Sequence, residues 1–507
     1  MLSTRPRRSR NAARARQGRA SFFPLKRGLF ASALLYAAAG ATPAFASPPL
    51  AVANPDALEA PEADVAIQGQ QTNFMTGIWS RQTLFGDMGG LRSFLGRAGI
   101  TLDLTETSEL LGNLTGGTAK GHAYDGLTTA TLQMDTKQAF GWEGGLFNAS
   151  ALQIHGTNLS ERYLSTLNTA SGIEATPETR LWELWYQQSF FNKKFDIKIG
   201  QQSLDQEFMV STYAATFVNT MFGWPGVPSY DLPSGGPAYP LSGLGVRARG
   251  QIAPSLTALF GVFAGDPSGN REDTSGTNFS LNGSTLFIGE LQYGINQPVE
   301  GEMDLGTDGG NNNALPGMYK LGAWYHNGSF ADQRFDTNGV PLVNPGSNGI
   351  GAQHHGNYSI YAVADQMVWR PDPAEPKSLG VFARVMYAPT DQNLVRASAN
   401  LGVTLKAPFN GRDNDTAGLA VTYIKVSDQA RQSDQDFIDE NPGTFALLRS
   451  SETVLEATYQ YQVTPWWVLQ ADAQYVFNPG GGIVNPNDPT QKIKNEFVLG
   501  LRTNITF

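Results

Sequence analysis

Apolar and polar residues alternate with a period of two in sixteen short segments of the sequence, which run from about Gly99 to Phe507. The last segment is the clearest example, since Leu499 and Leu501 alternate with residues of the other face that include Glu496 and Arg502. Successive side chains of a β-strand point to opposite faces, so each segment has one apolar and one polar face. The pattern therefore predicts an all-β protein with sixteen strands.

The gaps between these segments are alternately short and long. Short turns are predicted at 140–143, 192–194, 251–254, 371–376, 410–412 and 464. Long polar loops are predicted near 112–124, 156–179, 203–240, 266–284, 327–356 and 427–450, and the gap 297–315 is an exception because it is long where a short turn is due. The strands of a transmembrane barrel turn tightly on the periplasmic side and loosely outside. We therefore expect a transmembrane antiparallel β-barrel of sixteen strands with both ends periplasmic.

The chain divides into three parts. Residues 1–46 are predicted to be a cleaved signal peptide, because nine Lys and Arg residues precede or flank an apolar run at 28–40 and Ala-Phe-Ala at 44–46 offers small residues for cleavage. Residues 47–97 are expected to form a flexible leader that ends in a short periplasmic helical segment. The outer-membrane β-barrel is expected at 98–507.

Composition agrees with an exported barrel. The hydrophobic fraction is 41% and the mean hydropathy is −0.26, and the predicted mature chain has no run of the about 18 apolar residues that a membrane helix needs. The chain has no cysteine, which excludes disulfides and thiolate metal sites. Removing the nine positive charges of residues 1–46 changes the net charge from −9 to −18, so nucleic acid is not an expected partner.

Charged residues within the predicted strands are assigned to the lumen, because an Arg or Lys facing lipid at mid-depth costs about 2–4 kcal/mol. This rule turns Asp196, Lys198, Arg247 and Arg249 inward. The same rule assigns nine further charged residues to the lumen: Glu183, Glu290, Lys320, Arg384, Lys406, Glu456, Asp472, Glu496 and Arg502. Both signs are present, which argues against a pore selective purely by charge. For any one of these residues, pairing with a neighbouring lumen side chain is the alternative to contact with a solute.

Short motifs in the first half of the sequence are a second line of evidence. They are GGL at 89–91, GITLD at 99–103, NLTGG at 113–117, RLWELWYQQ at 180–188, IGQQSLD at 199–205, EF at 207–208, GWP at 223–225, YP at 239–240 and GVRAR at 245–249. Their order and spacing resemble the OprB family of carbohydrate-selective outer-membrane porins, most closely over roughly residues 76–266. The resemblance implies a monomeric sixteen-stranded barrel that admits glucose-like sugars by facilitated diffusion, with a long loop folded into the lumen.

The best candidate for this internal loop is 202–239. It is unusually apolar for a loop in water, so we expect it to fold inward and narrow the pore. Aromatic rings suit the C–H faces of sugars, and charged groups suit their hydroxyls. The candidate substrate-binding and constriction residues are therefore Glu183, Trp185, Lys198, Asp205, Glu207, Trp224, Arg247 and Arg249. Packing of the loop is the alternative role for each of them.

The expected partners are small sugars, outer-membrane lipid and lipopolysaccharide of a Gram-negative bacterium, and the barrel-assembly machinery. In such barrels a terminal aromatic residue such as Phe507 resembles the signal that this machinery reads. No nucleic acid, cofactor or metal is expected.

Enzymatic alternatives find little support in the sequence. The five histidines form no His-Glu-x-x-His motif, and no Gly-x-Ser-x-Gly lies between a predicted strand and a helix, so no catalytic residue is predicted. Three other functions stay open: a porin for other solutes, a structural or adhesive barrel, and an outer-membrane or secreted β-rich glycan hydrolase. The last needs only a pair of carboxylates, and the chain has 45 acidic residues.

Overall fold

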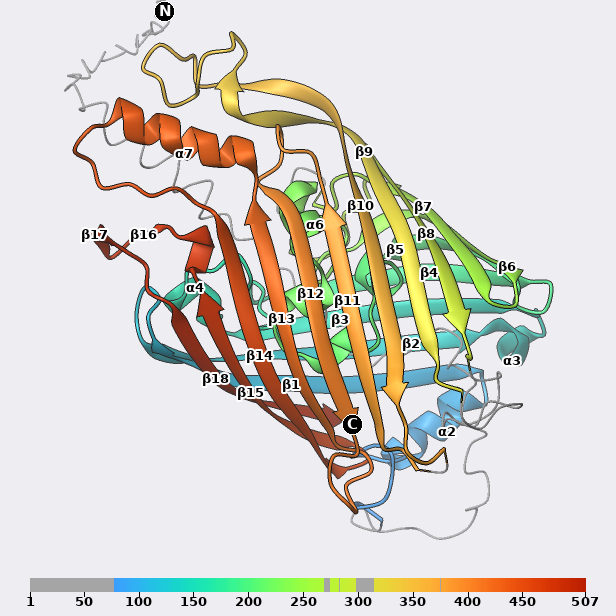
Figure 1. Ribbon diagram of the computed structural model, residues 1–507. Coiled ribbons are helices and arrows are strands. Elements are labelled where there is room, and N and C mark those ends of the chain that lie inside the picture. Colours follow the sequence, from blue (N-terminus) through green and yellow to red (C-terminus); the bar gives the residue numbers. More distant parts are fainter. Residues whose placement is uncertain (1–76, 269–273, 282, 298–313, 374) are drawn as a thin grey trace, which may run out of the picture. The chain divides into compact units, whose positions relative to one another are not determined.

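The computed structural model describes residues 77–507 except 269–273, 282, 298–313 and 374. The predicted signal peptide at 1–46 and the leader up to residue 76 lie outside the described residues. Sixteen antiparallel strands form one closed barrel (Figure 1). The fold class and the strand number predicted from the alternation are confirmed.

The elements follow one another along the barrel wall and its loops. The barrel strands are β1 (Ile100–Thr115), β2 (Gly121–Asp135), β3 (Gly145–Gly156), β4 (Thr179–Phe190), β5 (Phe195–Gln202), β6 (Gly243–Ala253), β7 (Leu256–Ala264), β8 (Thr285–Ile295), β9 (Gly317–Asp336), β10 (Gly351–Trp369), β11 (Ser378–Tyr387), β12 (Val395–Lys406), β13 (Thr416–Val426), β14 (Ser451–Thr464), β15 (Trp467–Phe477) and β18 (Glu496–Thr506). A separate hairpin is formed by β16 (Val484–Asn485) and β17 (Asp488–Lys492). The α-helices are α2 (Leu91–Gly96), α3 (Thr136–Phe140), α4 (Leu159–Tyr163), α5 (Thr220–Gly223), α6 (Gly226–Asp231) and α7 (Asp428–Glu440). The 3₁₀ turns are η2 (Met88–Gly90), η3 (Leu204–Gln206), η4 (Ala214–Thr216), η5 (Pro233–Gly235) and η6 (Pro479–Gly481).

The barrel closes where the first strand pairs with the last. Strand β1 pairs antiparallel with β2 on one side and with β18 on the other, with Glu109 opposite Arg502 and Thr105 opposite Thr506. Every barrel strand thus has two neighbours, so its backbone donors and acceptors are paired along both edges. The start of β1 and the end of β18 lie at the same rim, which is also the rim of the tight turns.

The connections follow the predicted rhythm with two differences. Strands β1 and β2 leave only 116–120 between them, so most of the loop predicted at 112–124 is strand. Strands β9 and β10 extend to Asp336 and from Gly351, deep into the loop predicted at 327–356. Both stretches alternate weakly and are polar on each face, as suits strands that continue into water.

The long gap at 297–315 does not hide a missed strand. Strands β8 and β9 are direct neighbours, with Leu286 opposite His326 and Ile295 opposite Gly317. The even strand count is therefore correct, although residues 298–313 of this connection lie outside the described part of the chain.

The two faces of each strand have the environments that parity predicts. In β18, Glu496, Val498 and Arg502 are buried, whereas Leu499 and Leu501 are 42% and 51% exposed. The buried face points into the lumen, where loops cover it, and the exposed face is the one available to lipid. Parity fails at Trp182, because a bulge in β4 aligns Ser150 with Glu183 but Ala151 with Leu181, and Trp182 is then buried beside Glu183.

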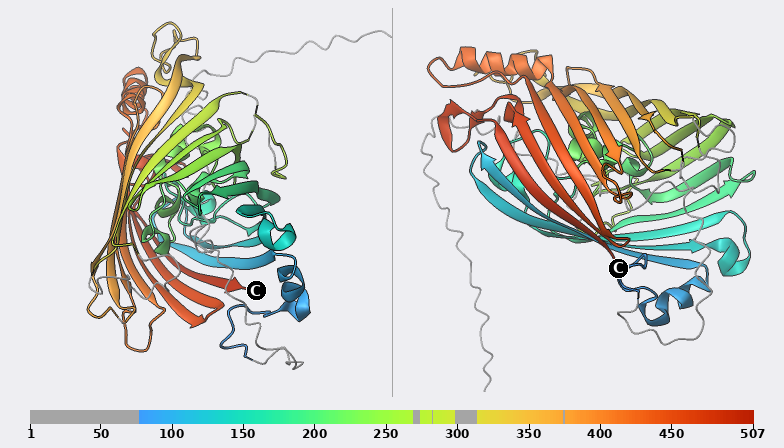
Figure 2. Two further views of the ribbon diagram at one scale, coloured as in Figure 1. Left: turned by 90° about the vertical axis from the view of Figure 1, so that its right-hand side faces the viewer. Right: turned by 60° about the horizontal axis from the view of Figure 1, so that its bottom comes forward.

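The described part of the predicted leader contains the expected short helix, α2, and fastens onto the end of the barrel. Leu84 N donates to Thr506 O at 2.8 Å, and Trp466 Nε1 donates to Ile78 O at 2.6 Å. Figure 2 shows α2, in blue, close to the C-terminal end of the chain. At the opposite rim, Arg334 of β9 binds Asp436 of α7, with Nε and Oδ2 2.6 Å apart.

Candidate pore constriction

The constriction loop, residues 203–242 between β5 and β6, folds into the barrel (Figure 1). Its apolar side chains, such as Phe208, Met209 and Trp224, are buried against wall residues that include Trp324 and Tyr361. Removing this much apolar surface from water stabilises the inward position. The prediction of an inward-folded loop is confirmed.

Charged wall residues hold the backbone of this loop. Arg384 of β11 donates to the carbonyl oxygens of Met209, Gly223 and Phe222 at 2.8, 2.9 and 3.0 Å, and also to that of Met221. The loop has only very short helices, so some of its buried N–H and C=O groups need partners outside the loop. Arg384 supplies donors for the turn at 221–223 and for Met209.

Carboxylates on the same half of the wall accept from N–H groups of the loop. Glu290 accepts from Met209 N at 2.8 Å, and Glu456 accepts from Val218 N and Asn219 N at 2.6 and 3.0 Å. Lys320 Nζ in turn donates to Val210 O at 2.8 Å. Parity placed these residues in the lumen correctly, but it gave no sign that they bind the loop.

A second loop, 157–178 between β3 and β4, also turns inward. Glu452 of β14 accepts from Leu167 N at 2.7 Å and Asn168 N at 2.9 Å, and Gly172 N donates to Val218 O of the constriction loop at 2.7 Å. The composition of this stretch predicted an ordinary polar loop. The inward turn could have been predicted from the apolar residues of this loop, Leu164, Leu167 and Ile173.

Glu174 stabilises this second loop through hydrogen bonds to the backbone of the same loop. Its carboxylate accepts from Leu159 N at 2.9 Å and Ser160 N at 3.1 Å at the start of α4. Complete burial raises the pKa of Glu174 to about 7, although hydrogen bonds from Ser160 and Leu159 lower it in part.

Five residues form a charged belt on β5, β6 and the start of the constriction loop. They are Asp196, Lys198, Glu207, Arg247 and Arg249. Arg247 binds both Asp196 and Glu207, its Nη2 lying 3.0 Å from Glu207 Oε1, while Arg249 Nε lies 2.8 Å from Asp196 Oδ2. Lys198 binds Glu207 as well. Burial alone raises the pKa of a carboxyl, but Lys198 and Arg247 outweigh it and lower the pKa of Glu207 to about 2.

The structure brings most of the predicted site residues together. Lys198, Glu207, Arg247 and Arg249 belong to the belt, and Trp185 lies next to it because Lys198 Nζ is 4.4 Å from the centre of its ring. Glu183 and Asp205 fasten the ends of the loop: Glu183 accepts from Ser203 N at 2.9 Å, and Asp205 from Tyr239 N at 3.2 Å.

Trp224 is the exception among the predicted residues. It is 1% exposed in the packed interior of the loop, and its Nε1 donates to Gly235 O at 2.8 Å. Its ring therefore packs the loop against the wall instead of facing a passage. Glu183, Asp205 and Trp224 thus hold the loop, and the residues of the belt and Trp185 remain the candidates for contact with a solute.

Neutral lumen residues that were not among the predicted candidates continue the polar surface onto the neighbouring strands. Gln187 accepts from Arg247 Nη2 at 3.1 Å. On β2 and β3, Thr131 Oγ1 lies 3.0 Å from Ser150 Oγ. Gln133 Nε2 donates to Asn148 Oδ1 at 3.1 Å. Parity alone identifies these inward positions, but neutral residues carry no charge signal that would have marked them.

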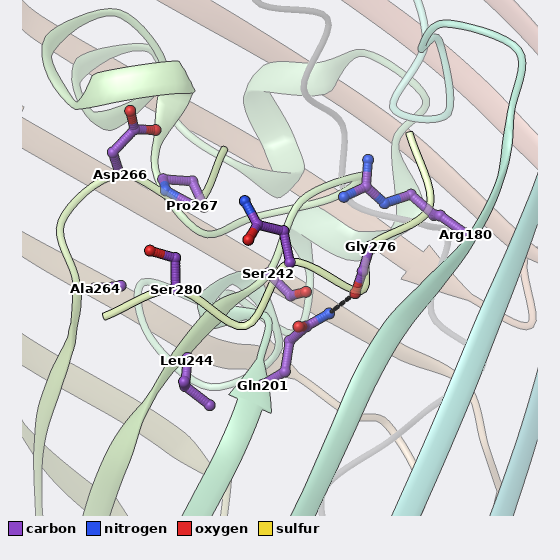
Figure 3. A pocket seen from close by; sticks show the side chains of 10 residues that line it. Arg180, Gln201, Ser242, Leu244, Ala264, Asp266, Pro267, Gly276 and Ser280 are labelled. Carbon is purple, nitrogen blue, oxygen red and sulfur yellow. Dashed lines mark hydrogen bonds between the residues drawn. The ribbon is translucent and has the colours of Figure 1, made fainter. Parts of the chain in front are cut away.

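A small polar hollow lies at the loop-bearing rim of β4 to β7 (Figure 3). Its lining includes Arg180, Gln201, Ser242, Asp266 and Gly276. Gln201 Nε2 donates to Gly276 O at 3.0 Å, which ties the backbone at Gly276 to the end of β5. The hollow therefore belongs to the rim of the barrel and is framed by loop contacts.

Comparisons with known proteins agree with this geometry. Residues 119–507 match the family model described as carbohydrate-selective porin, OprB family. The chain is 26% identical over 451 residues to Porin B of Pseudomonas aeruginosa, covering 84% of this chain and 91% of the relative. It is 23% identical over 461 residues to the putative porin QuiX of Acinetobacter baylyi, covering 87% and 97%. The high-pH structure of Pseudomonas putida OprB has the same fold, with a TM-score of 0.71 at 24% identity over 84% of this chain and 99% of that one.

Proposed function

Because the chain belongs to the OprB family of carbohydrate-selective porins, we propose that sugars pass through its lumen between the charged belt and the neutral polar residues of β2 and β3. The observation that carries this proposal is the belt itself, in which three cations and two anions face each other beside Trp185. The protein is an outer-membrane carbohydrate porin. The family and the named relatives indicate a channel and not an enzyme.

The pairing within the belt suits neutral solutes. A lone charge in a narrow lumen would attract ions of the opposite sign, whereas paired charges leave little net field. Guanidinium and carboxylate groups are strong donors and acceptors for hydroxyl groups, and an aromatic ring such as that of Trp185 suits C–H groups. Passage down the concentration gradient of the solute needs no energy input, and weak contacts let the solute leave the constriction quickly.

The proposal includes the route to the membrane. Residues 1–46 would be removed as a signal peptide, and Phe507 would be read by the barrel-assembly machinery. Lipid and lipopolysaccharide would then surround the exposed face of the strands. Each barrel would conduct by itself, as a monomer does, since one chain closes the lumen.

Single-channel recording in a planar bilayer tests the proposal. Glucose added on either side should reduce the ion current in a concentration-dependent and saturable way, because a sugar in the constriction excludes ions. An amino acid of similar size should block less. Equal block by both would favour a general or other-solute porin, and cleavage of an oligosaccharide by the purified protein would favour the hydrolase.

Replacing Arg247 and Arg249 together with alanine is expected to raise the ion conductance and weaken sugar block several-fold. Two bulky cations leave the constriction, and each lost charged hydrogen bond to a hydroxyl is worth about 1.5–3 kcal/mol at most. Arg247 is 1% exposed, and removing it together with Arg249 leaves Asp196 without its two arginines and Glu207 with Lys198 alone, so we also expect the loop to be less firmly held. Arg396→Ala, which removes an arginine bound to Asp428 away from the belt, is the matched control. Unchanged sugar block in an assembled double variant would contradict a role of these arginines in binding.

A further inference from the structure

The segment that precedes the first strand, residues 77–99, lies at the rim of the tight turns beside the end of the last strand (Figure 2). In β18, Leu499 and Leu501 face outward, and the same parity continues outward to Phe507. Phe85 of the segment stacks on Phe507, with ring centres 5.1 Å apart. The segment thus contacts the outward face of the barrel where the membrane-spanning part of that face ends.

A second contact places the start of the segment at the same level. Trp467 of β15 is directly opposite Ile505 of β18, and directly opposite residues of paired strands share a face, so Trp467 also points outward. Trp466 stacks on Trp467 with ring centres 5.9 Å apart, and its Nε1 donates to Ile78 O at 2.6 Å. Tryptophan is enriched where a membrane protein meets the lipid headgroups. The backbone at Ile78 therefore lies at the aromatic girdle of the barrel.

Large apolar side chains of the segment are exposed. Trp79, Leu91 and Phe94 are 70%, 44% and 62% exposed. Leu91 and Phe94 are three residues apart in α2 and lie on the same side of this short helix, whereas Arg92 on another side donates from Nε to Leu102 O of β1 at 3.3 Å. One side of α2 is thus held by the barrel and another is apolar and open. Exposed apolar side chains that gather in this way indicate a contact surface.

The segment is basic, although the chain as a whole is acidic. Residues 77–99 contain three arginines and one aspartate, which gives a net charge of +2, whereas the predicted mature chain has a net charge of −18. Arg97, at the end of α2, lies with its guanidinium 5.8 Å from the centre of the Phe94 ring. A basic side chain beside an exposed aromatic ring fits the boundary between anionic headgroups and acyl chains, where the ring meets the chains and the cation meets a phosphate.

The position of the segment determines which lipid it meets. The tight turns of a transmembrane barrel lie on the periplasmic side, and the start of β1 lies at the rim of these turns. The membrane surface at this rim is that of the inner leaflet, which consists of phospholipid. The apolar side chains of the segment are continuous there with the outward faces of β15 and β18, which already face acyl chains.

We propose that residues 77–97 form an interfacial anchor that lies along the inner leaflet of the outer membrane and binds anionic phospholipid. Its exposed apolar side chains enter the region where acyl chains meet headgroups, and Arg97 binds a phosphate group. The interfacial anchor also fixes the closing seam to the membrane surface, because Leu84 N donates to Thr506 O at 2.8 Å. The proposal does not depend on which solute passes through the lumen.

Fluorescence quenching in the full mature protein tests the proposal, because the chain has no native cysteine and one can be labelled at will. Phe94→Cys, labelled with an NBD fluorophore, is the probe. Leu501→Cys on the outward face of β18 is the reference for lipid contact, and Phe445→Cys, an exposed aromatic position in the loop after α7, is the matched control. The protein is reconstituted in phosphatidylglycerol vesicles that contain lipids with a nitroxide group on the acyl chain.

The nitroxide lipids should quench the probe at position 94 several-fold more strongly than the control at position 445, and about as strongly as the reference at position 501. Heat-modifiable migration in gels verifies that each labelled variant is an assembled barrel. Equal quenching at positions 94 and 445 in assembled barrels would overturn the proposal. Protection of position 94 from both the nitroxide lipids and aqueous iodide would overturn it as well, because the segment would then be covered by protein.

A charge variant tests the choice of an anionic lipid. Arg97→Glu, added to the labelled Phe94→Cys protein, should lower the ratio of docked to undocked anchor in phosphatidylglycerol about fivefold, the change that about 1 kcal/mol of attraction per basic residue produces. In phosphatidylcholine, which has no net charge, the variant should change little. Arg431→Glu, the same substitution at an exposed position of α7, is the matched control. Equal quenching of the Arg97→Glu and Arg431→Glu proteins in phosphatidylglycerol would contradict the binding of an anionic headgroup.

Discussion

Replacing Arg384 with methionine is expected to free part of the constriction loop from the barrel wall and to raise the ion conductance of single channels several-fold. The guanidinium is 1% exposed and donates to four carbonyl oxygens of the loop. A buried acceptor that loses its partner costs about 1–3 kcal/mol, and methionine offers no donor to replace any of the four. The turn at 221–223 and the backbone at Met209 should therefore detach from the wall, and sugar block should fall with this detachment.

Single-channel recording measures the conductance, and hydrogen exchange of residues 209–223 measures the detachment directly. Arg334→Met is the matched control, since Arg334 binds Asp436 of α7 at the rim and does not touch the loop. If Arg384→Met keeps both the wild-type conductance and slow exchange in this segment, the apolar contacts of Phe208 and Trp224 suffice to hold the loop.

The barrel wall was predictable because its rule is local. Each membrane-spanning strand faces lipid on one side and the lumen on the other, so a period of two is visible in the sequence wherever a strand crosses the membrane without a bulge. Arg247 and Lys198 were placed in the lumen correctly for this reason. Where a bulge shifts the period, as at Trp182, the local rule fails and nothing in the sequence marks the shift.

The use of each lumen charge was not predictable in the same way. Arg384 and Met209 meet although they are far apart in sequence, and a charge that binds a loop backbone has the same pattern as one that meets a solute. The inward turn of loop 157–178 was missed because Glu452 and Glu174, which hold it, also look like ordinary charges of a wall and a polar loop. Only the structure shows which charged side chains of the lumen bind the inner loops.

Deleting Phe507 or replacing it with aspartate is expected to reduce the amount of assembled barrel several-fold while leaving the conductance of the remaining channels unchanged. Phe507 N donates to Leu104 O at 2.9 Å across the closing seam between β18 and β1. Its ring stacks on Phe85, with ring centres 5.1 Å apart, and its carbonyl oxygen accepts from Arg92. The residue thus joins the last strand to the first strand, to α2 and to the segment before α2.

None of these contacts faces the constriction. Loss of Phe507 should therefore weaken the pairing of β18 with β1 and leave permeation unchanged. Heat-modifiable gel migration of the protein from isolated membranes measures the assembled fraction. Single-channel recording measures the conductance of the barrels that still assemble. Phe409→Asp is the matched control, because Phe409 is an aromatic residue, 62% exposed, on the turn between β12 and β13 at the same rim. If the two aspartate variants assemble equally well, the seam contacts of Phe507 are dispensable.

A further variant, Phe85→Ala, distinguishes two roles of Phe507, which are recognition during assembly and stacking in the folded barrel. It removes the stacking partner of Phe507 but keeps Phe507, the residue that assembly would recognise. A loss of heat stability without a loss of assembled protein would show that the stacking stabilises the finished barrel and is not needed for its assembly.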